Sequence, residues 1–136
     1  MVVEEVMSRD PIAVEVTESI GQALAKLAEA DIRHLPVVED GALVGIVSDR
    51  DLRAFTPAAL TEYERPDVVR ERLDQAVATV MAADVFSVDP EAELSEVVEL
   101  MLDHKVGAVP VVEPDGSRLV GIVSYMDVLR VLADQL

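Results

Sequence analysis

The chain has 136 residues, 51% of them hydrophobic, and its 27 acidic against 11 basic side chains give a formal net charge of −16. This length suits one domain or two small halves that share an aliphatic core. The negative field disfavours nucleic acid and anionic membranes as partners. Because the chain has no cysteine, disulfides, thiol catalysis and Cys-ligated metals are excluded.

The N-terminal stretch MVVEEVMSRDP (1–11) is acidic and lacks the long apolar run of a secretory signal. No stretch approaches the roughly 18 apolar residues that a membrane helix needs. We therefore expect a soluble cytoplasmic protein.

The first half of the chain reads as alternating strands and helices. IAV (12–14) is a short β-prone run, and TESIGQALAKLAEAD (17–31) opens with a helix N-cap candidate and shows helical spacing of its apolar residues. LPVV (35–38) and LVGIV (43–47) flank an Asp-Gly turn signal, which predicts a hairpin. A closing helix is expected from about Asp49.

Residues 56–75 predict a helical linker. Thr56-Pro57 is typical of an N-cap followed by a proline in the first helical position, and Pro66-Asp67 predicts a break before another helix. The basic residues Arg65, Arg70 and Arg72 alternate with acids, which favours a solvated helix face.

The second half repeats the first. Segment 3–14 recurs at 77–88 and segment 32–39 at 106–113, both 74 residues later, whereas LVGIVS (43–48) recurs 76 residues later at 119–124. The second copy again predicts a strand at 86–88, a helix at 91–104, a hairpin and a closing helix from about Tyr125. Each copy is β-α-β-β-α and too small to bury both faces of its sheet alone, so we expect the copies to pack together.

Two such units, each with VM, then a Pro-Val-Val strand, then GIVSxxD, resemble a tandem pair of CBS (cystathionine β-synthase) domains, a Bateman module. The resemblance covers 2–55 as the first motif and 76–133 as the second, with 56–75 as linker. It implies an α/β (α+β) fold with two motifs related by a pseudo-twofold axis. It also implies two clefts that bind AMP, ADP, ATP or S-adenosylmethionine, and dimerisation into a flat disc.

The doubled Ser-x-x-Asp pattern, Ser48 to Asp51 and Ser124 to Asp127, has two interpretations. It is typical of a helix capping box. A carboxylate can also accept both hydroxyls of a ribose, while a serine and free helix amides face a phosphate. The resemblance implies that Asp51 and Asp127 hold ribose and that Ser48 and Ser124 lie near phosphate.

The resemblance further implies an adenine slot in each copy. Several of its members are equally plain core residues of such a fold. The slot residues are Asp10, Ile12, Ala13, Ile32 and Leu35 in the first copy and Asp84, Phe86, Ser87, Val106 and Val109 in the second.

Basic residues distinguish the two copies. Arg33-His34, with Arg50, could neutralise a phosphate, although a surface Arg paired with a nearby acid is the alternative. In the second copy Gly107-Ala108 replaces Arg33-His34, and Tyr125-Met126 replaces Asp49-Arg50. We expect a less polar second site, with compensation by Lys105, Arg118 or a borrowed Arg33 or His34 left open.

Catalytic motifs are absent from the sequence. His34 and His104 form no H-x-x-x-H pair, and no nucleotide-binding glycine loop or nucleophile elbow occurs. We expect a regulatory module that is not an enzyme, needs no cofactor, takes Mg²⁺ only alongside a polyphosphate, forms a homodimer and signals to an unidentified downstream protein. A dimerisation protein with vestigial clefts is the alternative, and a metal- or polyphosphate-linked hydrolase is a weaker one.

Overall fold

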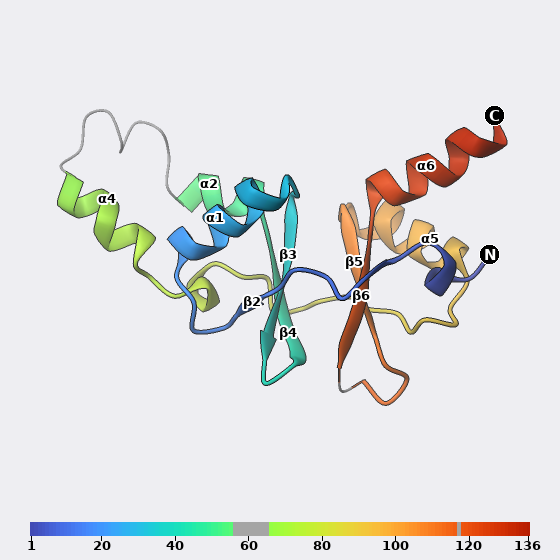
Figure 1. The fold of residues 1–136 in the computed structure, drawn as a ribbon, viewed down its shortest axis with the longest axis horizontal. Helices are drawn as coiled ribbons and strands as arrows, with labels where there is room; N and C mark the ends of the chain where they lie inside the picture. The colour runs from blue at the N-terminus through green and yellow to red at the C-terminus, as the bar shows by residue number, and fades with distance from the viewer. Residues whose placement is uncertain (56–65, 117) are drawn as a thin grey trace. The chain divides into compact units, whose positions relative to one another are not determined.

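The computed structural model describes residues 1–55, 66–116 and 118–136, which group into two compact units. The first unit comprises Ile12–Asp40 and Val44–Ala83; the second comprises Met1–Pro11, Gly41–Leu43 and Asp84–Leu136. Each carries a three-stranded sheet with helices packed on it (Figure 1). The mixed α/β architecture confirms the predicted fold class.

The sheet of the first unit has the order β2-β3-β4, with β2 parallel to β3. Its elements alternate along the chain as the sequence predicts, and the Thr56-Pro57 cap and Arg65 lie outside the described residues. The bounds are β2 (Val14–Glu15), α1 (Ile20–Ala30), β3 (His34–Glu39), β4 (Ala42–Ser48), α2 (Asp49–Phe55), α4 (Pro66–Leu73) and the 3-10 turn η2 (Val77–Thr79).

Helix α1 begins where a capping box forms. The Ser19 hydroxyl accepts the Gln22 amide (3.1 Å), and the Gln22 side chain accepts the Ser19 amide (2.8 Å), so the helix begins inside the predicted segment 17–31. Its apolar face, Ile20, Ala23 and Leu27, is buried in the core. The helix ends at Asp31, whose φ of 53° is left-handed.

A two-residue turn closes the β3–β4 hairpin. Asp40 and Gly41 both have positive φ, 53° and 84°, as a type I′ turn requires. The Asp-Gly signal therefore predicted this hairpin correctly.

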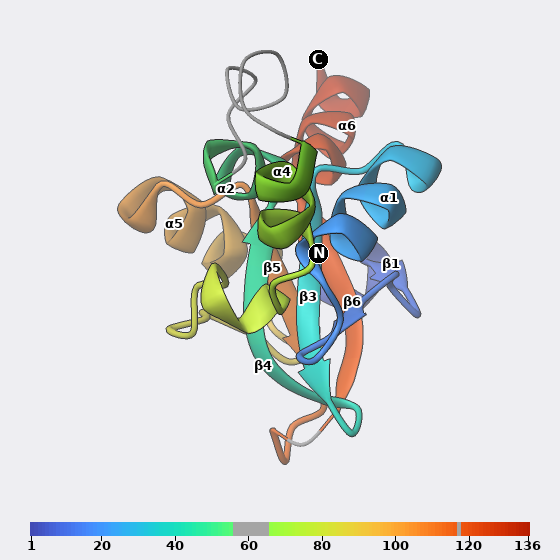
Figure 2. The ribbon, with the colours of Figure 1, turned by 90° about the vertical axis from the view of Figure 1, so that its left-hand side faces the viewer.

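The second unit has the sheet order β1-β6-β5, with both pairs antiparallel. In Figure 2 the short β1 lies against β6. The bounds are η1 (Val3–Glu5), β1 (Ser8–Arg9), α5 (Leu94–His104), β5 (Ala108–Val112), β6 (Leu119–Ser124) and α6 (Tyr125–Gln135).

The strand predicted at 86–88 is reduced to a single bridge between Val88 and Val111. In the first repeat the strand pairing extends further, because the Val16 amide donates to the Val38 carbonyl (2.9 Å). Its equivalent 74 residues later is Pro90, which has no N–H to donate. The proline therefore ends the ladder early.

The first segments of the two repeats are exchanged between the units. Ser8 and Arg9, from the first repeat, pair with Ile122 and Gly121 of β6. Ala82, from the second repeat, exchanges both backbone hydrogen bonds with Ile46 of β4 (2.9 and 3.0 Å). Packing therefore joins each repeat's first segment to the strands of the other repeat.

The exchanged segments contribute to the cores as well as to the sheets. Val3 has no exposed surface and belongs to the core of the second unit, together with Val97 and Val123. Val77, its equivalent, is equally buried in the core of the first unit. Each unit is thus completed by a segment from the other repeat.

Glycines in β4 and β6 give these segments room. A Cβ built on Gly121 would lie 2.5 Å from the Met7 sulfur and 3.0 Å from the Ser8 carbonyl oxygen. A Cβ on Gly45 would meet the Met81 sulfur at 2.6 Å and the Ala82 carbonyl oxygen at 3.1 Å. Both repeats therefore need glycine here, because backbone and methionine occupy the space of a side chain.

We predict that Gly121→Ala lowers the free energy of unfolding by about 1–3 kcal/mol, since the added methyl overpacks this contact. Urea unfolding followed by circular dichroism measures the change. The control is Gly21→Ala in α1, where the nearest atom would lie 3.4 Å away. That change should be neutral or stabilise by about 0.5–1 kcal/mol; equal losses for both variants would contradict the close-approach explanation.

Candidate functional site

The two strand-to-helix corners share one backbone scaffold. In the first unit the Asp49 amide donates to the Arg33 carbonyl (2.8 Å), which ties the start of α2 to the loop before β3. In the second the Tyr125 amide donates to the Gly107 carbonyl (2.9 Å). The structure therefore brings the predicted loop and corner residues of each copy together.

The second corner is a complete capping box. The Ser124 hydroxyl accepts the Asp127 amide (3.3 Å), and the Asp127 carboxylate accepts both the amide (2.8 Å) and the hydroxyl (3.0 Å) of Ser124. Arg130 donates to the other carboxylate oxygen (3.3 Å). The Asp127 side chain, 13% exposed, is thus committed to the protein itself.

The first corner is only half of such a box. The Ser48 hydroxyl accepts the Asp51 amide (3.1 Å), as at the second corner. The Asp51 side chain is exposed, and its carboxylate accepts no hydrogen bond and forms no ion pair within residues 1–55, 66–116 and 118–136. This carboxylate is available to an external donor.

Basic side chains surround the first corner. Asp49 binds Arg53 tightly, with 2.9 and 3.0 Å from the guanidinium Nε to its two oxygens, and Arg33 loosely at 3.7 Å. The Arg33 and Arg53 side chains are 69% and 70% exposed. Arg50 is exposed next to them. Arg53 was not among the predicted site residues, although its position four residues after Asp49 is the spacing of a helical ion pair.

His34 is the titratable group that this corner perturbs. Burial, which penalises the imidazolium, lowers the pKa of His34, and the negative charge of Asp51 opposes that shift in part. A further anion beside His34 would favour its charged form. Binding of such an anion would therefore be linked to proton uptake by His34.

The residues predicted to form the adenine slots are not equally placed. Leu35 and Val109 have no exposed surface, so their side chains belong to the cores. Ile12 is 46% exposed, and the Ala13 carbonyl accepts Lys26 Nζ (2.8 Å). Asp10 belongs to the second unit, whereas Ile12 and Ala13 belong to the first.

The remaining slot residues are partly or fully accessible. Their role in ligand binding stays a prediction. Ile32 and Val106 are half-buried, and Asp84, Phe86 and Ser87 are exposed. Gly107 and Ala108, which replace Arg33-His34 in the second copy, are less accessible: Gly107 is half-buried and Ala108 is buried, 5% exposed.

An aromatic pair missed by the sequence analysis lies in the second unit. The rings of Phe86 and His104 stack with centroids 3.9 Å apart and an angle of 19° between their planes. Phe86 was a predicted slot residue, whereas His104 was not. The first repeat gives no signal for the pair, because Ile12 and Ala30 occupy the equivalent positions.

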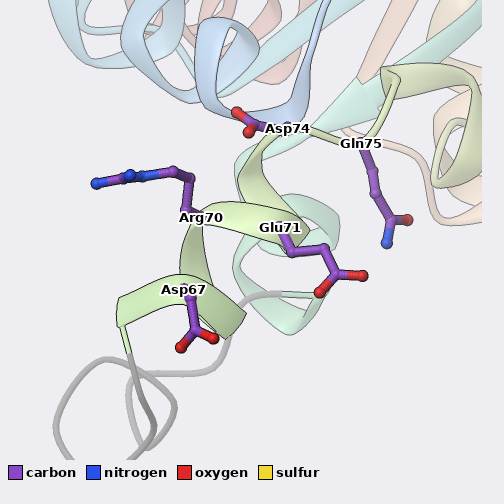
Figure 3. A pocket seen from close by; sticks show the side chains of 5 residues that line it. All are labelled: Asp67, Arg70, Glu71, Asp74 and Gln75. Carbon is purple, nitrogen blue, oxygen red and sulfur yellow. The ribbon is translucent and has the colours of Figure 1, made fainter.

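A shallow hollow on α4 is a weaker candidate. It is lined by Asp67, Arg70, Glu71, Asp74 and Gln75. Figure 3 shows Arg70 and Asp74 pointing away from Glu71 and Gln75, so the side chains do not converge on a common point. Across the part of the chain that the structure describes, no three His, Asp or Glu side chains are grouped to hold a metal ion.

The CBS domain model matches this chain twice, over residues 3–57 and 77–134. The chain belongs to the CBS domain family. Its helices, as far as the structure describes them, include none with the length and apolar character to cross a membrane. Among curated relatives of this CBS domain pair, a CBS domain-containing protein of Dictyostelium discoideum is 30% identical over 97% of this chain and 91% of the relative.

Other relatives of the pair are much longer. The chain spans 32% of an uncharacterized Methanocaldococcus jannaschii protein, MJ1404, with 32% identity. It spans 23% of the inosine-5'-monophosphate dehydrogenase of the same organism, with 31% identity.

Solved structures of CBS proteins superpose on the whole chain. The CBS domain pair of protein MJ0100, in complex with 5'-methylthioadenosine and S-adenosyl-L-methionine, gives a TM-score of 0.82 at 27% identity and covers 100% of this chain and 98% of that one. CBSX2 in complex with AMP gives 0.79 at 29% identity, covering 98% and 96%. Both ligand sets contain adenosine.

We predict that His34 makes the protein less stable in mild acid. Because the folded-state pKa of His34 lies below its ordinary value of about 6.5, the unfolded chain binds the proton more readily. The contribution of His34 to stability is therefore complete above pH 6.5 and is lost as the pH falls below it. Thermal unfolding from pH 8 to 5 should show a smaller decline in His34→Asn than in the parent. Identical slopes would contradict the assignment.

Proposed function

We propose that this CBS pair is a sensor that binds an adenosine-containing ligand and signals its bound state to a partner protein. The free carboxylate of Asp51, beside Ser48, Arg33 and His34, is the observation that carries the proposal. The ligands of protein MJ0100 and CBSX2 support the choice of adenosine compounds.

Asp51 is suited to a ribose. A carboxylate with free oxygens can accept hydrogen bonds from both hydroxyls of a ribose diol. A structural acid would instead be expected to close the capping box, as Asp127 does. The free Asp51 therefore favours the ligand-binding interpretation of the first corner over the capping one.

The phosphate would lie among Ser48, Arg33 and His34. The Ser48 oxygen accepts the Asp51 amide, and a hydroxyl that accepts one hydrogen bond can still donate its proton to a phosphate oxygen. Within the described residues, Arg33 is held only by the 3.7 Å contact to Asp49, and it can move to a phosphate at little cost. In a chain of net charge −16, such local cations are needed to hold an anion.

The second corner is a poorer ribose site in this conformation. A diol there must compete with the two Ser124 donors and Arg130 for the Asp127 carboxylate. The adjoining residues, Gly107 and Ala108, bring no cation. We infer that the two sites differ in affinity and that the first prefers phosphate-bearing ligands.

Signalling would follow from differential affinity. A ligand that joins α2 to the loop before β3 stabilises the conformations in which those elements fit it, and the populations shift accordingly. The partner that reads this shift is a protein supplied separately or a further domain of a longer chain, as in the dehydrogenase relative that contains a similar region.

Thermal unfolding with a ligand panel tests the proposal. AMP, ATP with and without Mg²⁺, and S-adenosylmethionine are added in turn, and a ligand at 100 times its dissociation constant should add about 2.7 kcal/mol to the free energy of unfolding. Guanosine 5'-monophosphate serves as the base control. If no adenosine compound raises the melting temperature, the sensor proposal fails.

We predict that Asp51→Ala mainly affects ligand affinity and that Asp127→Ala mainly affects stability. Asp51→Ala should weaken AMP binding at the first site about tenfold or more, since it removes a charged acceptor, with little change in stability. Asp127→Ala breaks a capping box and should cost about 0.5–2 kcal/mol of stability. Isothermal titration and urea unfolding of both variants measure the difference; unchanged AMP affinity in Asp51→Ala would refute the ribose assignment.

A second candidate function is self-association of two copies through α6, and a separate observation supports it. Large apolar side chains of α6 are exposed, as is the residue that follows the helix: Tyr125 (44%), Met126 (44%), Leu129 (50%), Leu132 (48%) and then Leu136 (95%). The first three replace Asp49, Arg50 and Arg53 of α2, so the fold itself does not require them to be apolar. A self-complementary, uncharged stripe favours pairing with the same helix of a second copy.

We predict that Leu129→Arg weakens self-association, because it introduces a positive charge in the middle of the apolar stripe. The first repeat has an arginine, Arg53, at the equivalent position. Sedimentation equilibrium of the parent should show a dimer that this variant shifts toward monomer. Leu102→Arg on α5, at a leucine that is 72% exposed, is the control and should leave the dimer intact. A monomeric parent would contradict the assembly role and leave the sensor proposal standing.

A further inference from the structure

Asp49 lies at the start of α2 between two arginines. Its carboxylate oxygens accept the Nε–H of Arg53 at 2.9 and 3.0 Å, and one of them lies 3.7 Å from a terminal nitrogen of Arg33. The backbone of Asp49 is held as well, because its amide donates to the Arg33 carbonyl (2.8 Å). The Asp49 carboxylate is therefore a fixed negative charge directly after Ser48 of the first corner.

The two arginines are bound to Asp49 in different ways. A separation of 3.7 Å is too long for a hydrogen bond, so Asp49 attracts the Arg33 guanidinium by charge alone. Within residues 1–55, 66–116 and 118–136, the Arg33 side chain donates no hydrogen bond, and its N–H groups are available to an anion. Arg53 makes the short contact that keeps the carboxylate in place. A phosphate bound to Arg33 would thus share that guanidinium with Asp49.

These three charged side chains are absent together from the second repeat. Their equivalents are uncharged: Gly107, Tyr125 and Leu129. The backbone hydrogen bond of the corner is nevertheless the same, because the Tyr125 amide donates to the Gly107 carbonyl (2.9 Å). The fold of the corner therefore does not require the charged group of the first repeat, which points to a role in what the first corner binds.

We propose that Asp49 is a specificity-determining residue of the first site, a built-in counter-anion that favours ligands with one phosphate over polyphosphates. The inference rests on the proposed function and extends it to a class of phosphate. The corner has three guanidinium groups and two carboxylates, an excess of a single positive charge: Arg33, Arg50, Arg53, Asp49 and Asp51.

The charge of the ligand decides how well it fits such a corner. A monophosphate carries about 1.5–2 negative charges and already balances the positive excess. Each further phosphate group brings negative charge close to the fixed Asp49 carboxylate, which repels it. Repulsion of the competing ligand is a common source of specificity, and here the repelling group is part of the site itself.

Isothermal titration of the full chain with adenosine, AMP and Mg²⁺-free ATP tests this role, at low salt because salt screens exposed charges. The component that Asp51→Ala weakens identifies the first site, where the parent should bind AMP more tightly than ATP. Asp49→Asn should tighten AMP binding about two- to fivefold, the range expected for one exposed ion pair, and ATP binding by a larger factor. Adenosine has no phosphate, so its affinity should not change.

Two further variants serve as controls. Glu39→Gln removes the same charge from an exposed residue at the far end of β3, about 16 Å from His34 at 3.3 Å per residue. It should leave all three affinities at the parent values. Asp49→Glu keeps the charge next to Ser48 and should retain the preference for AMP.

Several results would refute the role of Asp49 while the proposed function stands. They are tighter binding of ATP than of AMP by the parent, phosphate ligands that do not respond to Asp49→Asn, and adenosine binding that tightens as much as AMP binding. An equal effect of Glu39→Gln would assign the preference to the charge of the whole chain and would also contradict the proposal. If no adenosine compound binds the parent, the sensor proposal itself fails.

Discussion

The close approach of a Val-Met segment to a strand glycine is the contact on which both units depend. At Gly121 and at Gly45 a methionine sulfur and a carbonyl oxygen occupy the space where a side chain would stand. The contact brings a buried valine, Val3 or Val77, into the core of a unit built mainly from the other repeat. Each of these glycines lies in a strand, β4 or β6, that also leads into the Ser-x-x-Asp corner of its unit. The same strand therefore accommodates the incoming segment and carries the corner.

The corners show how one local pattern serves two purposes. A Ser-x-x-Asp sequence satisfies helix amides in both repeats, because both serines accept the amide three residues on. Only Asp127 completes the reciprocal bond, and Arg130 holds its second oxygen. The equivalent of Arg130 is Ala54, which cannot hold Asp51, while Arg53 turns to Asp49 instead. Small differences in neighbouring residues thus decide whether a cap acid is available to a ligand.

Local features were predictable from the sequence, whereas the pairing of segments that are far apart in the chain was not. The Asp-Gly hairpin, the apolar face of α1 and the start of α6 follow from turn chemistry, periodicity and capping. The exchange of first segments was missed, because VEEVM and VATVM are similar enough to fit either glycine. At the site, the residue types indicated the corners, whereas the free state of Asp51 and the Phe86–His104 stack depend on side-chain geometry that spacing does not specify.

The exchanged segments also bear on how such a chain could have arisen. A lone repeat with its own first segment could reach this packing only by trading that segment with another molecule, so its folding would depend on concentration. Duplication within one gene joins donor and acceptor covalently and replaces that dependence with a fixed effective concentration, of millimolar order for a short linker. Once two copies are joined, each completes the other's core while its exposed residues can diverge. One corner could then carry Arg33 and Arg50 while the other carries Gly107 and Met126 at the equivalent positions.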